Sequence, residues 1–220
     1  MRDFKIDNKG SAQIFHNPVL EYLTRTNFLF PVVFYYALAA INLAFAFNNQ
    51  EIHFVHVLWI FPLAMIAFTL VEYAIHRFLF HFNATTDKQV ELQYNIHGVH
   101  HEFPRDKDRL AMPPFVSIVL AAFFFFLFKI LMEDYGMMFF AGFVSGYSTY
   151  LIIHYAVHAL RPPKNFLKYW WRHHSHHHYS SVNTAYSVSF PIWDILFNTM
   201  PKAKGEEKRK IENSLPDRLR

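Results

Sequence analysis

Four apolar runs constrain the fold of this chain more than any other feature. They are Asn27–Phe47, Phe54 to about Tyr73 with an extension to His81, Phe115–Met132, and Met137 to about His158. Helices of about 20 apolar residues are long enough to cross the roughly 30 Å hydrocarbon core of a bilayer. The linkers Asn48–His53 and Glu133–Gly136 are short. The runs therefore predict an all-helical integral membrane protein with four transmembrane helices in two hairpins.

The basic residues give these hairpins an orientation. Of the 21 lysines and arginines, 20 lie in the N-terminal segment, in Arg77–Arg109 or from Arg161 onward, and the short linkers contain none. Lys129 is the exception, and its side chain can snorkel to the interface. Because cytoplasmic loops carry the excess of basic residues, we expect both termini and the middle segment in the cytoplasm.

The charge distribution also bears on partners. The basic residues flank the apolar runs and match no known nucleic-acid-binding module, so the net charge of +4 favours anionic lipid headgroups. We expect no nucleic-acid partner. The absence of cysteine excludes disulfides, thiolate nucleophiles and cysteine-ligated clusters. Any bound metal is therefore held by nitrogen and oxygen.

Histidine is the residue type that stands out. Twelve of the 15 histidines fall in four clusters, all on the predicted cytoplasmic side. The clusters are His76 and His81; His97, His100 and His101; His154 and His158; and His173, His174, His176, His177 and His178. The predicted topology rests on hydropathy and on basic residues alone. The gathering of the histidines on one side of the membrane is therefore independent support for it. His53 and His56 begin the second run at its other end, and we expect them outside the site.

The spacings are those of metal ligands on helices. His154 and His158 are four residues apart, and His97, His100 and His101 stand at i, i+3 and i+4, so each group is expected on one side of a helix. His76 and His81 would diverge by about 140° on a regular helix, which predicts a bend, a π-bulge or a helix end. The stretch WWRHHSHHHYSS at 170–181 holds two overlapping HxxHH registers. Periodicity does not choose between them.

Together the clusters indicate a site for two metal ions. Neutral imidazole binds zinc, copper, iron and nickel, and ten or so ligands exceed what one ion uses. Taken singly, a cluster can instead be a hydrogen-bonded helix contact, a metal scavenger or a proton-buffering patch. Iron with open positions can use O2 to attack unactivated C–H bonds, and lipids are substrates that offer such bonds. Glu72 is either a partner of a ligand histidine or a charge at a helix end.

Several segments carry a family resemblance. They are EYAIHRFLFH (72–81), HGVHHEFPRDKDRLAMPP (97–114), GYSTYLIIHYAVH (146–158), HHSHHHY (173–179) and SVSFPIWDILFNT (187–199). With them the sequence resembles the fatty acid hydroxylase and sterol desaturase superfamily from about Leu20 to Pro201. It is most similar to the membrane fatty acid 2-hydroxylases.

The resemblance implies a ligand set. Aligning Tyr179 with the family's HHxxHHY box, and Trp193 and Asp194 with the residues after it, selects the second register. The implied ligands are His76, His81, His97, His100, His101, His154, His158, His174, His177 and His178. His173 and His176 become neighbours of the ligands or surface residues. The chain departs from the family at Leu151, Ala159, Ser187 and Asn198, which bears on substrate fit and on groups around the ligands.

The fold expected from these observations has three segments. Residues 1–27 form a cytoplasmic or interfacial segment, residues 28–200 a membrane hydroxylase domain, and residues 201–220 a charged tail. Within the domain, a cytoplasmic helical cap completes the dimetal site. We expect it in a bacterial inner membrane or the endoplasmic reticulum, with the active site on the cytoplasmic side.

The expected function is O2-dependent hydroxylation at C2 of a fatty acyl chain, free or in a ceramide-type lipid. The resemblance implies two iron ions, and zinc would bind the same ligands. The N-terminal 27 residues are too short for the cytochrome b5 domain that eukaryotic relatives often carry, so electrons are expected from a separate cytochrome b5-like or ferredoxin-like carrier and its reductase. This carrier would dock on the basic residues of 161–172 and 202–210. The alternatives are sterol or carotenoid oxidation or desaturation, and a non-catalytic metal-handling membrane protein.

Overall fold

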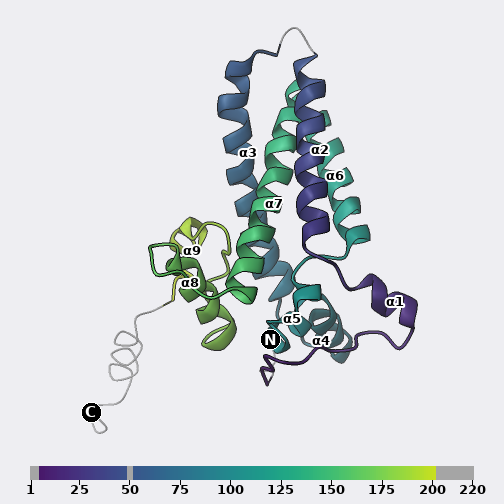
Figure 1. The fold of residues 1–220 in the computed structure, drawn as a ribbon, viewed down its shortest axis with the longest axis vertical. Helices are drawn as coiled ribbons and strands as arrows, with labels where there is room; N and C mark the ends of the chain where they lie inside the picture. The colour runs from purple at the N-terminus through teal and green to yellow at the C-terminus, as the bar shows by residue number, and fades with distance from the viewer. Residues whose placement is uncertain (1–4, 49–51, 202–220) are drawn as a thin grey trace.

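Four long helices form the body of the protein. The structure is a computed structural model that describes residues 5–48 and 52–201, and every regular element within these ranges is helical. The long helices are α2 (Leu29–Phe47), α3 (Phe54–Ala74), α6 (Pro114–Met132) and α7 (Gly136–Ala159). They stand side by side along the long axis of the molecule, and α7 contacts the other three (Figure 1).

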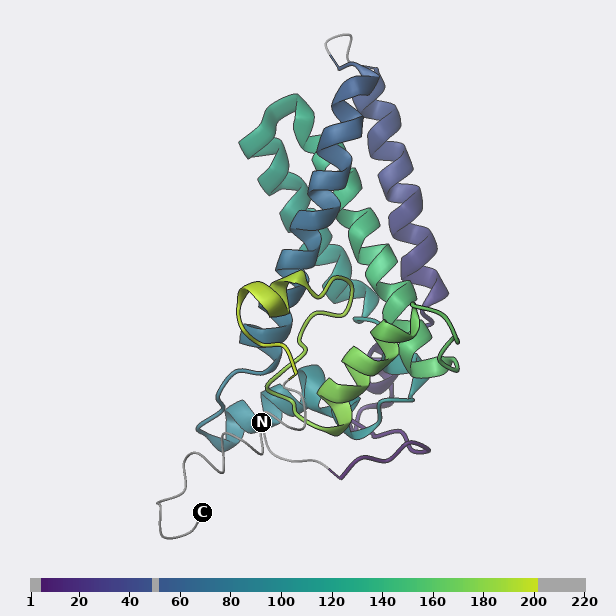
Figure 2. The ribbon, with the colours of Figure 1, turned by 90° about the vertical axis from the view of Figure 1, so that its left-hand side faces the viewer.

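The short elements other than η4 gather at one end of these helices (Figure 1). They are α1 (Pro18–Leu23), α4 (Asp87–Gln93), α5 (Val99–Glu102), α8 (Lys168–Tyr179) and α9 (Ile192–Leu196), with the π-helices η1 (Ile75–Phe80) and η2 (Tyr94–Gly98) and the 3₁₀ turn η3 (Lys107–Arg109). The 3₁₀ turn η4 (Glu133–Tyr135) joins α6 to α7 at the opposite end (Figure 1). The segment from α8 to α9 lies across the lower part of α3 (Figure 2). There the Trp193 indole N–H donates to Thr69 Oγ1 over 2.9 Å.

Three helical stretches are long and apolar enough to cross a membrane. They are Leu29–Phe47, Phe54–Phe80 and Lys107–Ala159. The third stretch contains both α6 and α7, which are joined by η4, where Glu133 has a positive φ of 49°. The sequence predicts four spans. The structure gives three stretches because α6, η4 and α7 follow one another without a break and count as one stretch. The predicted linker Asn48–His53 includes residues 49–51, and the predicted tail includes 202–220, which lie outside the described residues.

Helix α7 is the buried centre of the group. Phe140, Ala141 and Val144 of α7 pack with Tyr35 and Ala39 of α2 in one core cluster. Small residues on α7 let α3 pack closely against it. A Cβ at Gly142 would lie 2.4 Å from the carbonyl oxygen of Phe61, so only glycine fits there.

The phenylalanine-rich part of α6 faces two ways. Phe124, Phe125 and Phe128 pack against the core around α7, whereas Phe123 and Phe126 are exposed. The exposed face of this part of α6 is therefore apolar, which suits contact with lipid.

The end of α3 contains the irregularity that the sequence predicts. The helix widens into the π-helix η1, and the His81 N–H donates to the carbonyl of His76 over 3.2 Å. In a π-helix the hydrogen bonds run between residues five apart. His76 and His81 consequently point to the same side, as they would not on a regular α-helix.

An arginine fastens the N-terminal segment to the end of the protein that carries the histidines. The buried Arg109 guanidinium donates to Thr24 Oγ1 over 2.7 Å and to the carbonyl of Ala12 over 2.8 Å, and it pairs with Glu21. Leu110 follows Arg109 directly, and its carbonyl contacts His154. The contacts of Arg109 therefore fix the loop that reaches the histidines.

Candidate metal centre

Nine of the ten histidines that the resemblance implies as ligands gather in two groups that could each hold a metal ion. One group is His76, His81, His97, His101 and His177, and the other is His100, His154, His158 and His174. Within each group the candidate ligand atoms lie within 4.8 Å of one another. They come from the end of α3 and η1, from η2 and α5, from the end of α7 and from α8.

In the first group the Nε2 atoms meet in pairs. His76 and His101 each bring Nε2 to 3.1 Å from Nε2 of His97. Nε2 of His177 lies 3.1 Å from Nε2 of His81. All five rings therefore turn the same atom toward a common centre.

The second group has the same form. The Nε2 atoms of His100 and His154 are 3.2 Å apart, and those of His158 and His174 are 2.7 Å apart. His178, the tenth histidine, brings its Nε2 to 3.1 Å from Nε2 of His174. Its ring also stacks on His101 of the first group, with centroids 4.3 Å apart. His178 thus lies beside the second group, between it and the first.

This geometry fits metal ions better than hydrogen bonds. An imidazole nitrogen carries one N–H or one lone pair, yet Nε2 of His97 faces two Nε2 neighbours, and so does Nε2 of His174. Metal–nitrogen bonds of about 2.0–2.1 Å place neighbouring ligand atoms about 3 Å apart. The observed separations therefore match ligands that share a cation.

Backbone carbonyls fix the tautomer of three rings. Nδ1–H of His154 donates to the carbonyl of Leu110 over 3.0 Å, and Nδ1–H of His177 donates to that of Thr184 over 2.8 Å. His76 donates in the same way to Tyr186. A proton on Nδ1 leaves the Nε2 lone pair free for a metal. Among the described residues, the Nδ1 atoms of His81, His100, His101, His174 and His178 have no hydrogen-bond partner.

The rings are also in the protonation state that metals require. Burial, reinforced by neighbouring imidazoles, lowers the pKa of His97, His100, His101, His174, His177 and His178. For His177 the pKa falls to about 3. These imidazoles are neutral at pH 7 and offer lone pairs rather than charge.

Two buried carboxylates hold the loop that supplies the carbonyl of Tyr186. Asp194 accepts the backbone N–H groups of Tyr186 and Ser187, each over 2.9 Å, as well as the Thr199 hydroxyl and Nε2–H of His173. Burial alone would raise the pKa of Asp194, but the hydrogen bonds from His173, Thr199 and Ser187 outweigh it and lower the pKa. The carboxylate therefore stays charged and keeps the loop in place.

Glu72 acts on the same loop. Its Oε1 accepts the backbone N–H groups of Val188 and Ser189 over 2.6 and 3.1 Å. Glu72 lies in the last turn of α3, so it is a residue at a helix end, as one of the two sequence interpretations has it. It is buried, however, and it holds backbone on the far side of Tyr186 instead of bonding a histidine of the described residues.

Other predicted residues fall outside the two groups. His173 bonds to Asp194, and Nδ1 of His176 lies 3.3 Å from the Thr184 hydroxyl. The expectation that His97, His100 and His101 share one side is wrong, because His100 faces the second group. Adjacent residues on a helix point about 100° apart, so His100 and His101 reach different centres. His53 and His56 lie at the far end of α3, as expected.

Sequence reasoning missed the groups that orient the ligands. The carbonyls of Leu110, Thr184 and Tyr186 carry no signal in the side-chain pattern, because every residue has a carbonyl. Asp194 had a usable signal, as a lone acidic residue in the apolar stretch FPIWDILF. An isolated charge in such a stretch requires a partner when it is buried.

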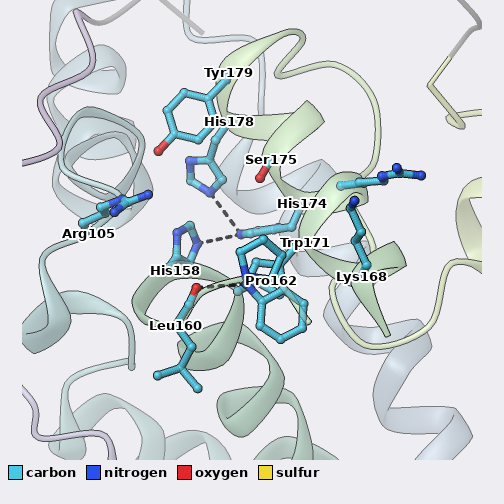
Figure 3. A pocket seen from close by; sticks show the side chains of 12 residues that line it. Arg105, His158, Leu160, Pro162, Lys168, Trp171, His174, Ser175, His178 and Tyr179 are labelled. Carbon is cyan, nitrogen blue, oxygen red and sulfur yellow. Dashed lines mark hydrogen bonds between the residues drawn. The ribbon is translucent and has the colours of Figure 1, made fainter. Parts of the chain in front are cut away.

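A cavity of about 310 Å³ opens beside the second group. Its lining includes His158, His174 and His178, and the three rings stand together in its middle (Figure 3). Molecules from outside can therefore reach this end of the site.

Comparisons with known proteins agree with this architecture. The family described as fatty acid hydroxylase matches residues 61–199. The chain is 32% identical over 195 residues to the ceramide very long chain fatty acid hydroxylase scs7 of Schizosaccharomyces pombe, covering 86% of this chain and 55% of that protein. It is 36% identical over 145 residues to the fatty acid 2-hydroxylase of Mus musculus, covering 64% and 39%. The chain thus spans about half or less of these relatives' length.

A plant relative and a solved structure cover more of the chain. The dihydroceramide fatty acyl 2-hydroxylase FAH2 of Arabidopsis thaliana is 27% identical over 204 residues, which is 90% of this chain and 83% of that protein. The solved structure is full-length scs7p with only the hydroxylase domain visible. It superposes with a TM-score of 0.80 at 31% identity and covers 88% of this chain and 74% of that chain.

The relatives named here are lipid hydroxylases, and the resemblance seen in the histidine motifs is confirmed. The part of the chain that the structure describes is all-helical and carries histidine groups that could hold metal. The chain belongs to the fatty acid hydroxylase family.

Proposed function

We propose that this protein hydroxylates C2 of a fatty acyl chain with a dimetal centre held by ten histidines. The observation that carries the proposal is the pair of adjacent, buried histidine groups whose Nε2 atoms converge. His76, His81, His97, His101 and His177 would hold one ion. His100, His154, His158, His174 and His178 would hold the other. Iron bound there supplies the O2 chemistry that attack on a C–H bond requires.

The side chains around the centre have three tasks. The histidines bind as neutral ligands, and the carbonyls of Leu110, Thr184 and Tyr186 orient three of them. Burial of the rings keeps bulk water away from the centre. The cavity beside His158 and His174 leaves one approach open for substrate. The chain's own residues thus organise and shield the site.

Reaction at C2 is supported by the relatives and by the position of the opening. The relatives in Mus musculus and Arabidopsis thaliana are named 2-hydroxylases. C2 is the carbon next to the head group, so the lipid has to present its polar end to the metals. A cavity that meets the second group at the end of α7, away from the apolar middle of the helices, suits that end of the molecule (Figure 3).

The proposal includes the membrane arrangement. Residues 28–200 form a membrane hydroxylase domain in which α2, α3, α6 and α7 each cross the bilayer, and the short elements form a cytoplasmic cap over the dimetal centre. The distribution of basic residues supports this orientation, because Arg105, Arg161, Lys168 and Arg172 all lie at the histidine end. Electrons come from a separate acidic carrier that docks on the basic residues of 161–172. The basic residues of 202–210 lie outside the described residues.

Lipid mass spectrometry of cells with and without the gene tests this function. We expect acyl chains that are heavier by one oxygen atom, with fragmentation that places the oxygen at C2. Cells carrying His177→Ala serve as the control and should lack the product. Unchanged lipids together with altered metal tolerance would contradict the proposal, and so would oxygen at another carbon.

A further inference from the structure

The cavity beside the second histidine group has a basic lining. Figure 3 shows His158, His174 and His178 in the middle, with Arg105 on one side of them and Lys168 on the other. Arg172 lines the cavity as well, and no aspartate or glutamate of residues 5–48 and 52–201 does. The cavity therefore concentrates positive charge at the point where the site opens.

These three cations have no anionic partner in the part of the chain that the structure describes. Arg109 and Lys129 take part in ion pairs there, whereas the side chains of Arg105, Lys168 and Arg172 make neither an ion pair nor a hydrogen bond. Among the described residues, the two histidine groups contain no carboxylate either. Two divalent ions held by neutral imidazoles would add positive charge that their ligands leave uncompensated. An anion is thus the ligand that the electrostatics of this cavity favour.

The rest of the lining is mostly apolar, apart from Ser175 and Tyr179. Val157 and Leu160 line the cavity from the end of α7. Trp171 lies beside Leu160, and its indole N–H donates to the Leu160 carbonyl over 3.1 Å (Figure 3). Such a wall suits methylene groups. The cavity therefore matches a molecule with an anionic end joined directly to a hydrocarbon chain.

We propose that this pocket binds the carboxylate of a free fatty acid, with Arg105, Lys168 and Arg172 as its counterions. The inference rests on the proposed function and deepens it by naming the head group. The carboxylate oxygens of a fatty acid are two covalent bonds from C2, about 2.4 Å away. Whatever recognises the head group must therefore lie near the metals, and these cations line the same cavity as His158, His174 and His178. The neutral amide of a ceramide-type lipid would gain far less from them.

Equilibrium binding tests the assignment without electrons or turnover. The metal-loaded protein in detergent is titrated with palmitate and with palmitamide, which have the same chain and differ in charge. We expect palmitate to bind about tenfold more tightly, because a charge-assisted hydrogen bond contributes more than a neutral one. Arg105→Gln should weaken palmitate binding about tenfold and leave palmitamide binding unchanged. Docking of an electron carrier cannot produce this result, since no carrier is present.

Two further variants keep the test decisive. Arg105→Lys retains the charge and should recover part of the affinity for palmitate. Lys88→Gln removes an exposed cation of α4, which does not line the cavity, and should have no effect. Metal content and melting temperature are measured for each variant to show that it is folded and loaded. Equal affinity for the two lipids in the unmodified protein, or undiminished palmitate binding in Arg105→Gln, overturns the proposal.

The head-group assignment and the proposed function can fail separately. If C2 hydroxylation occurs on ceramide-type lipids while palmitate shows no preferential binding, the function stands and the pocket assignment is wrong. If palmitate binds with the predicted dependence on Arg105 and no lipid is hydroxylated, the pocket stands and the function is wrong.

Discussion

His177 shows how one side chain in this site is set by its surroundings. It is fully buried in α8, its Nδ1–H donates to Thr184, and its Nε2 meets that of His81. The adjacent His176 points elsewhere and contacts the Thr184 hydroxyl. Neighbours on the same helix therefore have different environments, and their substitutions should have different effects.

Replacing His177 and His176 in turn compares these environments. His177→Ala should lose the ion of the first group, because the variant lacks a ligand atom and leaves a cavity in its place. His176→Ala should retain metal within about twofold of the unmodified protein, since its ring lies outside both groups. Elemental analysis of the purified variants measures this. Equal metal loss in both variants would show that the histidine register is wrong.

Asp194 should affect metal affinity without contacting the metal itself. Asp194→Asn replaces one acceptor oxygen by an NH2 group, so donors from Tyr186, Ser187, Thr199 or His173 lose their partner. The carbonyl of Tyr186 would then hold His76 less firmly. We expect metal affinity to fall about 10- to 100-fold, measured by competition with a chelator. Glu91→Gln on the exposed face of α4 is the control, and unchanged affinity in Asp194→Asn would rule out this role.

At the scale of helices, the sequence predicted what periodicity and hydropathy encode. The four long helices begin and end within about two residues of the apolar runs, and the irregular end of α3 is where the spacing of His76 and His81 requires it. The distribution of His97, His100 and His101 over two groups could not be predicted, because it depends on how their rings meet the histidines of η1, α7 and α8. The roles of Glu72 and Asp194 depend in the same way on a loop whose path the sequence pattern does not encode.

The contact between α3 and α7 provides a stability prediction. In Gly142→Ala the new Cβ would meet the Phe61 carbonyl oxygen, which is backbone and cannot rotate away. In Gly146→Ala it would meet the Phe68 side chain at 2.8 Å. We expect Gly142→Ala to be the more destabilising, by about 1–3 kcal/mol, with a lower melting temperature in detergent. A smaller effect at Gly142 than at Gly146 would mean that the two helices pack less closely than described.

At the scale of the whole molecule, the histidine groups lie at one end of the long helices and η4 at the other (Figure 1). Because the chain contains no cysteine, single cysteines report their own position without background. Asp134→Cys in η4 and Lys164→Cys before α8 should react with an impermeant thiol reagent from opposite sides of the membrane, with Lys164→Cys cytoplasmic. Reaction of both from the same side would refute the proposed four-span topology.

The central claim is that O2-derived oxygen enters at C2, and one isotope experiment tests it directly. Purified protein is supplied with a reductase, an electron carrier and palmitate deuterated at C2, under oxygen-18 gas, and the product is analysed by mass spectrometry. The account predicts a product that has lost one of its two C2 deuterium atoms and gained one oxygen-18 atom. A hydroxylated product that keeps both deuterium atoms, or that takes its oxygen from water, would contradict it.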